Sequence, residues 1–198
     1  MKKELLLSVL AIVIAAAILF GLSFGLNGIA AANAREDHLN LLKMMSPGSE
    51  NFTLEPYTGD DANIRSVHKG EKGFVIETVT YGYAGEITMY VGVSNEGKVT
   101  GLVVRDLSET YGLGREALTD VDFLKQFLNR DGTFAVATSG ADAFSGATDT
   151  ASSGEDTIDV DALTGATVTS KAVVRCINSA VAYVTGADAS TAATSWGG

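Results

Sequence analysis

A short run of small and hydroxyl-bearing residues before an apolar helix is the part of the sequence best suited to chemistry. The run reads Asp161-Ala-Leu-Thr-Gly-Ala-Thr-Val-Thr-Ser170. Apolar residues then recur at helical spacing from Val173 to Val184, which predicts a helix that starts near Thr169 and stops at Gly186. A helix start carries free N–H groups and a partial positive charge, so it attracts anions. The pattern therefore suits a phosphate group held close to the backbone at Gly165.

The hydroxyl groups of this run also have a plainer interpretation. Thr167, Thr169 and Ser170 can each cap the first N–H groups of the helix, as such residues do in many helices that bind nothing. Under that interpretation the domain is a binding or scaffold module without a cofactor. A cap alone does not decide between the two.

The same stretch closely resembles a known flavin-attachment motif. Residues 161–167 fit Asp-x-x-(Ser/Thr)-Gly-Ala-Thr, which is found in the G subunit of Rnf ferredoxin:NAD oxidoreductases and in the C subunit of sodium-pumping NADH:quinone oxidoreductases. In that family the last threonine carries FMN as a phosphoester, installed by a separate flavin transferase. The resemblance implies that Thr167 is the acceptor. It also implies that the neighbouring residues contribute to the FMN site: Asp161, Thr164, Gly165, Ala166, Thr169 and Ser170.

A second match to the motif occurs nineteen positions earlier, at residues 142–148. The surrounding segment is rich in Ala, Ser, Thr and Gly, so a match by composition alone is not surprising. Thr148 is followed by Asp149, Glu155 and Asp156, which would repel a phosphate, and by no apolar period that would start a helix. We therefore expect Thr148 to lie in a solvated loop.

Two glycine-bearing loops extend the resemblance. Residues 82–85 are similar to the family's Gly-Tyr-x-Gly segment, and residues 109–114 are similar to its Glu-Thr-Pro-Gly-Leu-Gly loop, with Tyr111 in place of proline. Family members use the second loop against the isoalloxazine ring, which needs a few polar contacts beside an apolar side chain. The site residues implied by these loops are Tyr83, Gly85, Glu109, Thr110, Gly112, Leu113 and Gly114.

The chain of 198 residues begins with an apolar segment. Leu5 to Leu26 contains no charged residue and is long enough to cross a membrane as a helix. Lys2 and Lys3 precede it, so we expect a cytoplasmic N-terminus and an extracytoplasmic remainder. Residues 32–34 (Ala-Asn-Ala) look like a signal-peptide cleavage site, but the apolar run exceeds the about 7–15 residues of a signal sequence. A single membrane anchor over residues 1–30 is the preferred interpretation.

Charge and cysteine content exclude several classes of function. The formal net charge of −10 disfavours nucleic acid and anionic lipid as partners. Cys176 is the only cysteine, so the chain has neither a disulfide nor an iron–sulfur cluster of its own, and its helical position is typical of a core residue. His38 and His68 lack ligand spacing, and we expect no metal site.

The remaining patterns predict an α+β domain over residues 31–186. Apolar spacing favours a helix from Ala31 to Met45, and alternation favours antiparallel strands over 74–80, 87–93 and 99–104. A short helix with Phe123 and Phe127 facing inward is expected after Thr119. Residues 129–160 are expected to form a polar surface segment with one strand at 133–137. A loosely held tail, 187–198, follows.

Together these features favour a single-span electron-transfer subunit of the Rnf type, with no general acid or base of its own. The resemblance implies partners of two kinds: iron–sulfur and flavin subunits in the membrane, and a flavin transferase for maturation. The C subunit of the quinone-reducing pump is the nearest alternative, although its chain is usually longer.

Overall fold

The computed structural model describes residues 32–107, 118–137, 157–163 and 165–186. The chain divides into two compact units, Met1–Leu41 and Leu42–Gly198. The expected membrane segment, the loop 109–114, the second motif copy at 142–148, Thr164 and the tail all lie outside the described residues. In the part of the chain that is described, no helix combines the length and apolar character needed to span a membrane.

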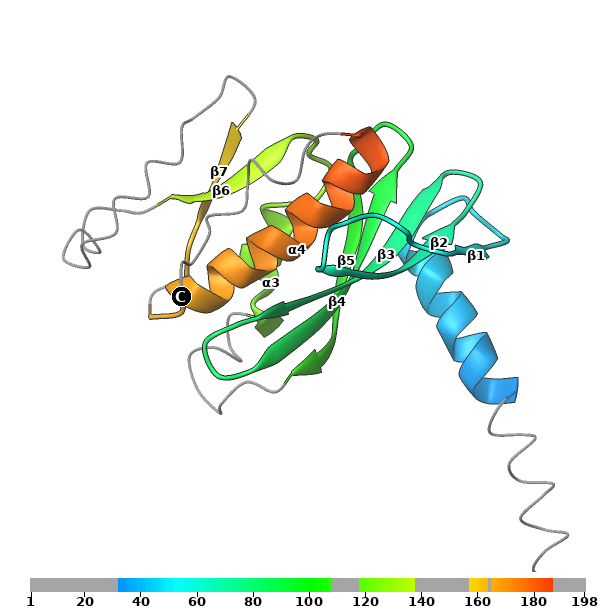
Figure 1. Cartoon of the computed structure of the whole chain (residues 1–198), viewed down its shortest axis with the longest axis horizontal. Coiled ribbons are helices and arrows are strands. Elements are labelled where there is room, and N and C mark those ends of the chain that lie inside the picture. The colour runs from blue at the N-terminus through cyan, green and yellow to red at the C-terminus, as the bar shows by residue number, and fades with distance from the viewer. Residues whose placement is uncertain (1–31, 108–117, 138–156, 164, 187–198) are drawn as a thin grey trace, which may run out of the picture. The chain divides into compact units, whose positions relative to one another are not determined.

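A five-stranded antiparallel sheet forms the centre of the larger unit (Figure 1). Its strands follow one another in sequence order, so each pairs with the next through a short connection. The strands are β1 (Thr53–Glu55), β2 (Ile64–Lys69), β3 (Gly73–Tyr81), β4 (Glu86–Ser94) and β5 (Val99–Leu107). The α+β class and the mainly antiparallel sheet are therefore as predicted. The three strands expected from alternation correspond to β3, β4 and β5.

The long C-terminal helix α4 (Thr167–Thr185) packs against one face of this sheet (Figure 1). Ile87, Met89, Val91 and Val93 alternate along β4 toward that face, and each has no exposed surface. Cys176 and Ile177 meet them from α4 and are equally buried. This apolar layer holds the helix in place and supplies most of the core.

A second, smaller sheet consists of two parallel strands, β6 (Thr133–Ala137) and β7 (Thr157–Asp161). The helix α3 (Val121–Lys125) precedes β6, with Asp120 capping its first N–H groups. The rings of Phe123, Phe127 and Phe134 stack edge to face at 5.4 and 5.2 Å and join α3 and β6 to the core. The sequence does not predict β7, because the pattern of residues 129–160 indicates a polar surface segment with a single strand.

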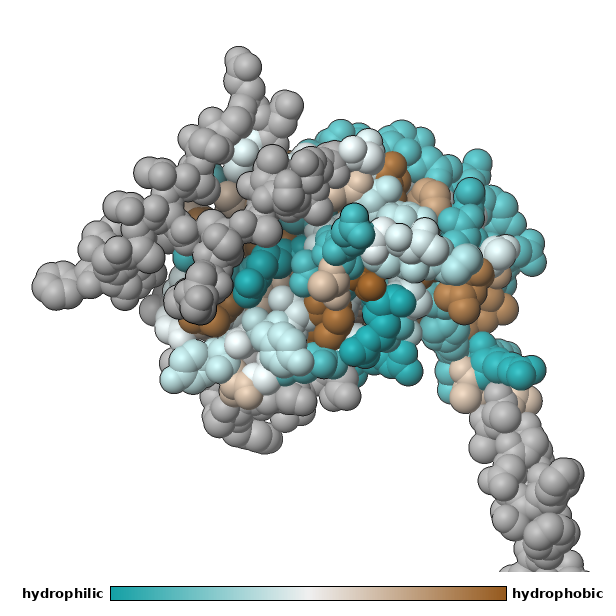
Figure 2. Space-filling model, in the orientation of Figure 1, coloured by the Kyte–Doolittle hydropathy of each residue, from teal (hydrophilic) through white to brown (hydrophobic). Residues whose placement is uncertain are grey.

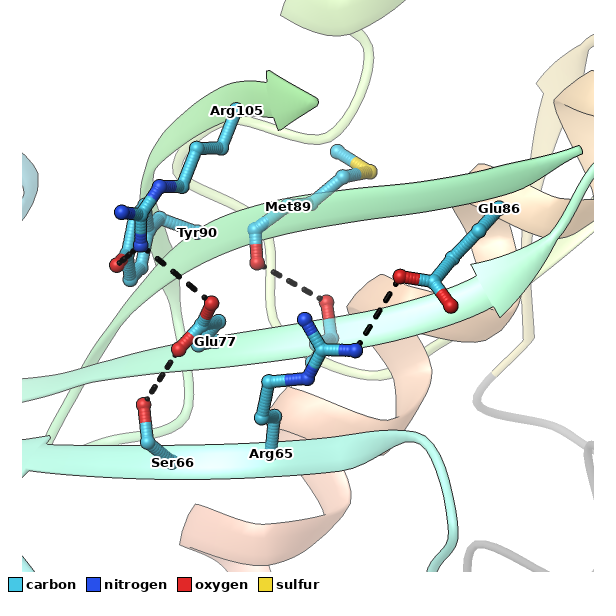
Figure 3. A network of polar contacts seen from close by, with 8 residues as sticks. Arg65, Ser66, Glu77, Glu86, Met89, Tyr90 and Arg105 are labelled. Carbon is cyan, nitrogen blue, oxygen red and sulfur yellow. Dashed lines mark hydrogen bonds and ion pairs between the residues drawn. The ribbon is translucent and has the colours of Figure 1, made fainter. Parts of the chain in front are cut away.

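The opposite face of the five-stranded sheet is partly polar. Glu77 accepts a hydrogen bond from Ser66 at 2.9 Å and pairs with Arg105 at 3.5 Å (Figure 3). Arg105 also donates to the Tyr90 hydroxyl at 2.5 Å. Burial and the nearby Glu77 carboxylate raise the pKa of Tyr90, so this hydroxyl stays neutral and accepts from the guanidinium.

The helix over residues 32–45 ends at this second face, as the Ser46-Pro47-Gly48 sequence predicted. Met45 is buried, and its carbonyl oxygen accepts a hydrogen bond from Thr100 Oγ1 at 2.6 Å. A Cβ added to Gly92 would collide with that oxygen. A glycine is therefore needed where the chain at Met45 crosses β4.

Candidate functional site

The predicted acceptor segment connects β7 directly to α4. Asp161 is the last residue of β7, and Thr167 is the first residue of α4. The helix therefore begins two residues before the expected position near Thr169, and Thr167 lies at its first turn. Thr167 is partly exposed and Val168 is 43% exposed, so this end of the helix is accessible from solvent.

The backbone between these elements forms a turn at Gly165. The Ala166 N–H donates to the Leu163 carbonyl at 2.9 Å, and Gly165 has φ of +79°, a conformation that residues with a side chain rarely adopt. Ala166 is the N-cap residue and has no side chain that could accept from the first turn. The turn thus places glycine at the left-handed backbone position and a small alanine at the N-cap of the helix.

The hydroxyl groups of Thr169 and Ser170 do not cap the helix as predicted. Ser170 Oγ instead accepts from the Leu163 N–H at 3.3 Å, outside the helix, because it points back toward the turn. Thr169 is 1% exposed, and its Oγ1 has no hydrogen-bond partner within the described part of the chain. A buried hydroxyl without a partner is costly, so a bound group that reaches it would be favoured.

The electrostatic character of the helix start suits an anion. The first turn of α4, all of it described, contains no acidic residue. Lys171 lies one turn after Thr167, and such i, i+4 positions are neighbours on a helix surface. The partial positive charge of the helix N-terminus adds to that of the lysine. A negatively charged substituent on Thr167 would therefore be stabilised from two sources.

Strand β3 runs antiparallel to α4, which places the β3–β4 hairpin toward the start of the helix. The Phe74 ring meets Tyr183 at 5.9 Å, and further along β3 the Arg175 side chain donates to the Tyr81 carbonyl at 3.4 Å. The hairpin of residues 82–85 continues in the same direction and is closed by a Gly82 N–H to Gly85 carbonyl bond of 2.9 Å. Tyr83 in this hairpin is 79% exposed.

Strand β5, which precedes the third motif in sequence, ends at the same end of the sheet. Ile87, the second residue of β4, pairs with Leu107, the last residue of β5. The segment that contains Glu109, Thr110, Gly112, Leu113 and Gly114 follows two residues later, outside the described residues. The end of β5 and the β3–β4 hairpin thus lie at the same end of the sheet, although they are more than twenty residues apart in sequence. On the face seen in Figure 2, the described residues form a mainly hydrophilic surface with small, separate apolar areas.

The comparisons with known proteins agree with the motifs. The FMN-binding domain family matches residues 82–182, which is just over half of the chain. The G subunit of an ion-translocating oxidoreductase complex from Methanosarcina acetivorans is 33% identical over 161 residues, which cover 75% of this chain and 76% of the relative. The chain belongs to this family of FMN-binding G subunits.

Two further G subunits match over shorter stretches. The one from the proton-translocating ferredoxin:NAD(+) oxidoreductase complex of Clostridium ljungdahlii is 34% identical over 122 residues, 61% of this chain and 58% of the relative. The one from the Na(+)-translocating ferredoxin:NAD(+) oxidoreductase complex of Acetobacterium woodii is 32% identical over 110 residues, 55% of this chain and 47% of the relative. The matched region thus spans about half of these two relatives. The expected resemblance to the Rnf-type G subunits is confirmed.

Sequence reasoning missed two residues of the site. Lys171 could have been found from its spacing to Thr167 alone. Gln126 could not, because its side chain bonds to Asp161, and the contact joins positions 35 residues apart. The assignment to the G-subunit family rests on the comparisons, and the structure adds the contacts that hold the motif in place.

Proposed function

We propose that this chain is the flavin-carrying electron relay of an ion-translocating ferredoxin:NAD oxidoreductase complex, with FMN joined to Thr167 through a phosphoester. The observation that carries the proposal is the position of the complete seven-residue motif, whose last threonine is the first residue of α4. Membership of the FMN-binding family supports FMN as the cofactor. The relatives, which are G subunits of ion-translocating oxidoreductase complexes, support the kind of complex proposed.

The attachment is a phosphoryl-type group transfer. The Thr167 oxygen forms a bond to the FMN phosphorus of flavin adenine dinucleotide, and the phosphorus–oxygen bond of the pyrophosphate breaks. AMP leaves with the bridging oxygen, and the hydroxyl proton passes to a base of the flavin transferase. The product is a phosphodiester with one negative charge. This chain needs no catalytic residue of its own for the step.

The helix start would then hold the new charge. The dipole of α4 and the Lys171 ammonium both favour an anion at this position. Gly165 and Ala166 leave the backbone free of bulky side chains near the phosphate. Thr169 lies about 200° around the helix from Thr167, on the face turned to the sheet. Its buried hydroxyl can bond to a polar atom of a cofactor that reaches this layer.

The flavin ring would lie toward the end of the sheet formed by β3, β4 and β5. The β3–β4 hairpin brings Tyr83 and Gly85 to this end. Strand β5 ends there too, and Glu109, Thr110 and Leu113 follow it in sequence. An aromatic ring, an apolar side chain and polar groups are what an isoalloxazine requires. When bound, FMN supplies the redox chemistry, and the chain positions it and adjusts its potential.

The relay would operate outside the cytoplasm. The apolar segment Leu5–Leu26, preceded by two lysines, is proposed as the single anchor that leaves the FMN domain on the far side of the membrane. Electrons would come from an iron–sulfur centre and pass to a second flavin, both in neighbouring membrane subunits. A covalent bond keeps the cofactor from diffusing away in that compartment.

Ultraviolet fluorescence of the denatured chain in a gel tests the proposal directly. The wild-type chain and Thr148→Ala, each produced together with the flavin transferase, should fluoresce, and Thr167→Ala should not. A dark wild-type chain would favour a membrane-anchored scaffold without a cofactor. Fluorescence lost in Thr148→Ala and kept in Thr167→Ala would assign the attachment to the other copy of the motif.

A further inference from the structure

The side-chain amide of Gln126 bonds to both backbone groups of Asp161, the N–H and the carbonyl. Gln126 Oε1 accepts from the Asp161 N–H at 2.8 Å, and Gln126 Nε2 donates to the Asp161 carbonyl at 3.3 Å. Gln126 is the C-cap residue of α3, and Asp161 ends β7. The two bonds occupy both backbone groups of the residue at which the acceptor segment begins.

This pair completes a set of contacts along the acceptor segment. Gln126 holds Asp161, the Ser170 hydroxyl holds the Leu163 N–H, and the Leu163 carbonyl accepts from Ala166. The segment is therefore held at Asp161 by the end of α3 and at Leu163 by Ser170 of α4. Since Thr167 follows Ala166 directly, the direction in which its hydroxyl points depends on both anchors.

The position of Gln126 argues against a role in stability alone. Asn178 makes the same two-sided pair with Phe134 of β6, but that pair is buried in the core. The pair made by Gln126 is solvent-exposed, so water can replace its bonds when the amide is removed. Loss of the Gln126 amide should therefore affect the geometry of the segment more than the stability of the domain.

We infer that Gln126 is a positioning residue for flavin transfer to Thr167, which it influences by fixing the acceptor segment at Asp161. The inference rests on the proposed function. A segment that is already ordered presents the hydroxyl in the geometry for attack, whereas a loose one must be ordered by the transferase at the expense of binding. Loss of the Gln126 amide should then appear as a raised KM for the acceptor chain, because fewer chains have Thr167 in the geometry for transfer at a given time.

The test compares two substitutions that each remove one exposed side-chain amide from the full chain. Gln126→Met keeps an unbranched stem and removes both bonds to Asp161. Asn95→Met is the matched control. Asn95 lies in the β4–β5 turn, at the other end of β4, and its Nδ2 donates to the Glu71 carbonyl at 3.3 Å. Flavin transfer is followed with purified transferase and flavin adenine dinucleotide, and backbone exchange of residues 161–167 is followed in the unloaded chain by hydrogen–deuterium exchange.

Gln126→Met should raise the KM for the acceptor chain about tenfold and speed exchange over residues 161–167. Asn95→Met should leave both unchanged, and the thermal midpoints of the two variants should fall by similar small amounts. Gln126→Glu keeps the acceptor for the Asp161 N–H and loses the donor, so its KM should lie between those of the wild-type chain and Gln126→Met.

Two results would overturn the inference. Wild-type exchange in Gln126→Met would show that the amide does not hold the segment. Faster exchange with a wild-type or lower KM would show that order in the segment does not assist transfer. Failure of the proposed function is distinguishable from both, because the wild-type chain would then take up no flavin.

Discussion

The side-chain amide of Asn178 bonds to both backbone groups of Phe134, with the Phe134 N–H to Oδ1 at 2.9 Å and Nδ2 to the Phe134 carbonyl at 2.8 Å. The pair joins α4 to the edge of β6 that does not pair with β7, and it is buried in the core. An edge strand that is covered by a helix must find partners for its backbone groups, and a single amide supplies both. Gln126 does the same for β7 at Asp161.

Asn178→Leu should lower the free energy of unfolding by at least about 2 kcal/mol, because two buried backbone groups lose their partners. Chemical denaturation measures the change. Ser179→Ala is the control on the next residue of α4, since it removes only a part-buried bond of 3.2 Å from Asn63. Equal losses of free energy of unfolding in the two variants would show that the paired amide contributes no more to stability than the single bond of Ser179.

Lys171→Met should destabilise the flavin-loaded chain more than the unloaded one. The phosphodiester on Thr167 lies one helical turn away, and such pairs contribute about 0.2–0.5 kcal/mol at the surface. Thermal unfolding of both forms at low and high salt measures the difference, which should shrink as salt screens the charges. A loss that is identical in loaded and unloaded chains would remove Lys171 from the phosphate site.

Burial raises the pKa of the Cys176 thiol from its ordinary value of 9.0 to about 11. Between these two values the Cys176 thiol is protonated in the folded chain but ionised in the unfolded chain. The contribution of this thiol to the free energy of unfolding is therefore complete below pH 9 and is lost as the pH rises toward 11. Stability should fall over this window by about 2–3 kcal/mol from this group. Cys176→Ala should show a shallower fall in denaturation experiments over the same window, and an identical slope would contradict the burial effect.

Gly92→Ala should cost about 1–3 kcal/mol, because the new methyl group would collide with the Met45 carbonyl. Gly101→Ala is the matched control on the paired residue of β5. Its Cβ would lie 3.0 Å from the Met45 Sδ, on a flexible side chain, and 3.2 Å from the Met45 Cα, whereas a Cβ at Gly92 would lie closer still to the Met45 carbonyl oxygen. Denaturation should rank Gly92→Ala as clearly the more harmful. The reverse order would mean that Met45 is not held against β4.

The sequence was sufficient wherever one element carried its own signal. Alternation along β4 predicted both the strand and its buried face, and the apolar stripe with Gly186 predicted α4 and its end. The hydroxyl residues Thr169 and Ser170 predict a helix start two residues later than the observed start of α4 at Thr167. In the structure Ala166 occupies the N-cap and the hydroxyl groups serve other purposes.

Features that depend on contacts between distant segments were not predictable in this way. Strand β7 has only Ile158 and Val160 as apolar residues. Its parallel partner β6 is bound at Phe134 by Asn178 of α4, and β7 itself is bound at Asp161 by Gln126. The sequence does not predict β1 and β2, because residues 53–69 are mostly polar. Their pairing starts from the neighbouring β3, which pairs with β2. The Gln126 contact with Asp161 depends on the same tertiary arrangement.

Peptide mapping of the native, flavin-loaded chain by mass spectrometry tests the central claim most directly. Trypsin alone cannot separate the two candidate threonines, because no lysine or arginine lies between Arg130 and Lys171. Cleavage after Glu155 does separate them, since it is the only glutamate in that interval. We predict an FMN adduct on the fragment that contains Thr167 and an unmodified fragment that contains Thr148. An unmodified Thr167 fragment from protein isolated from its own host would contradict the account.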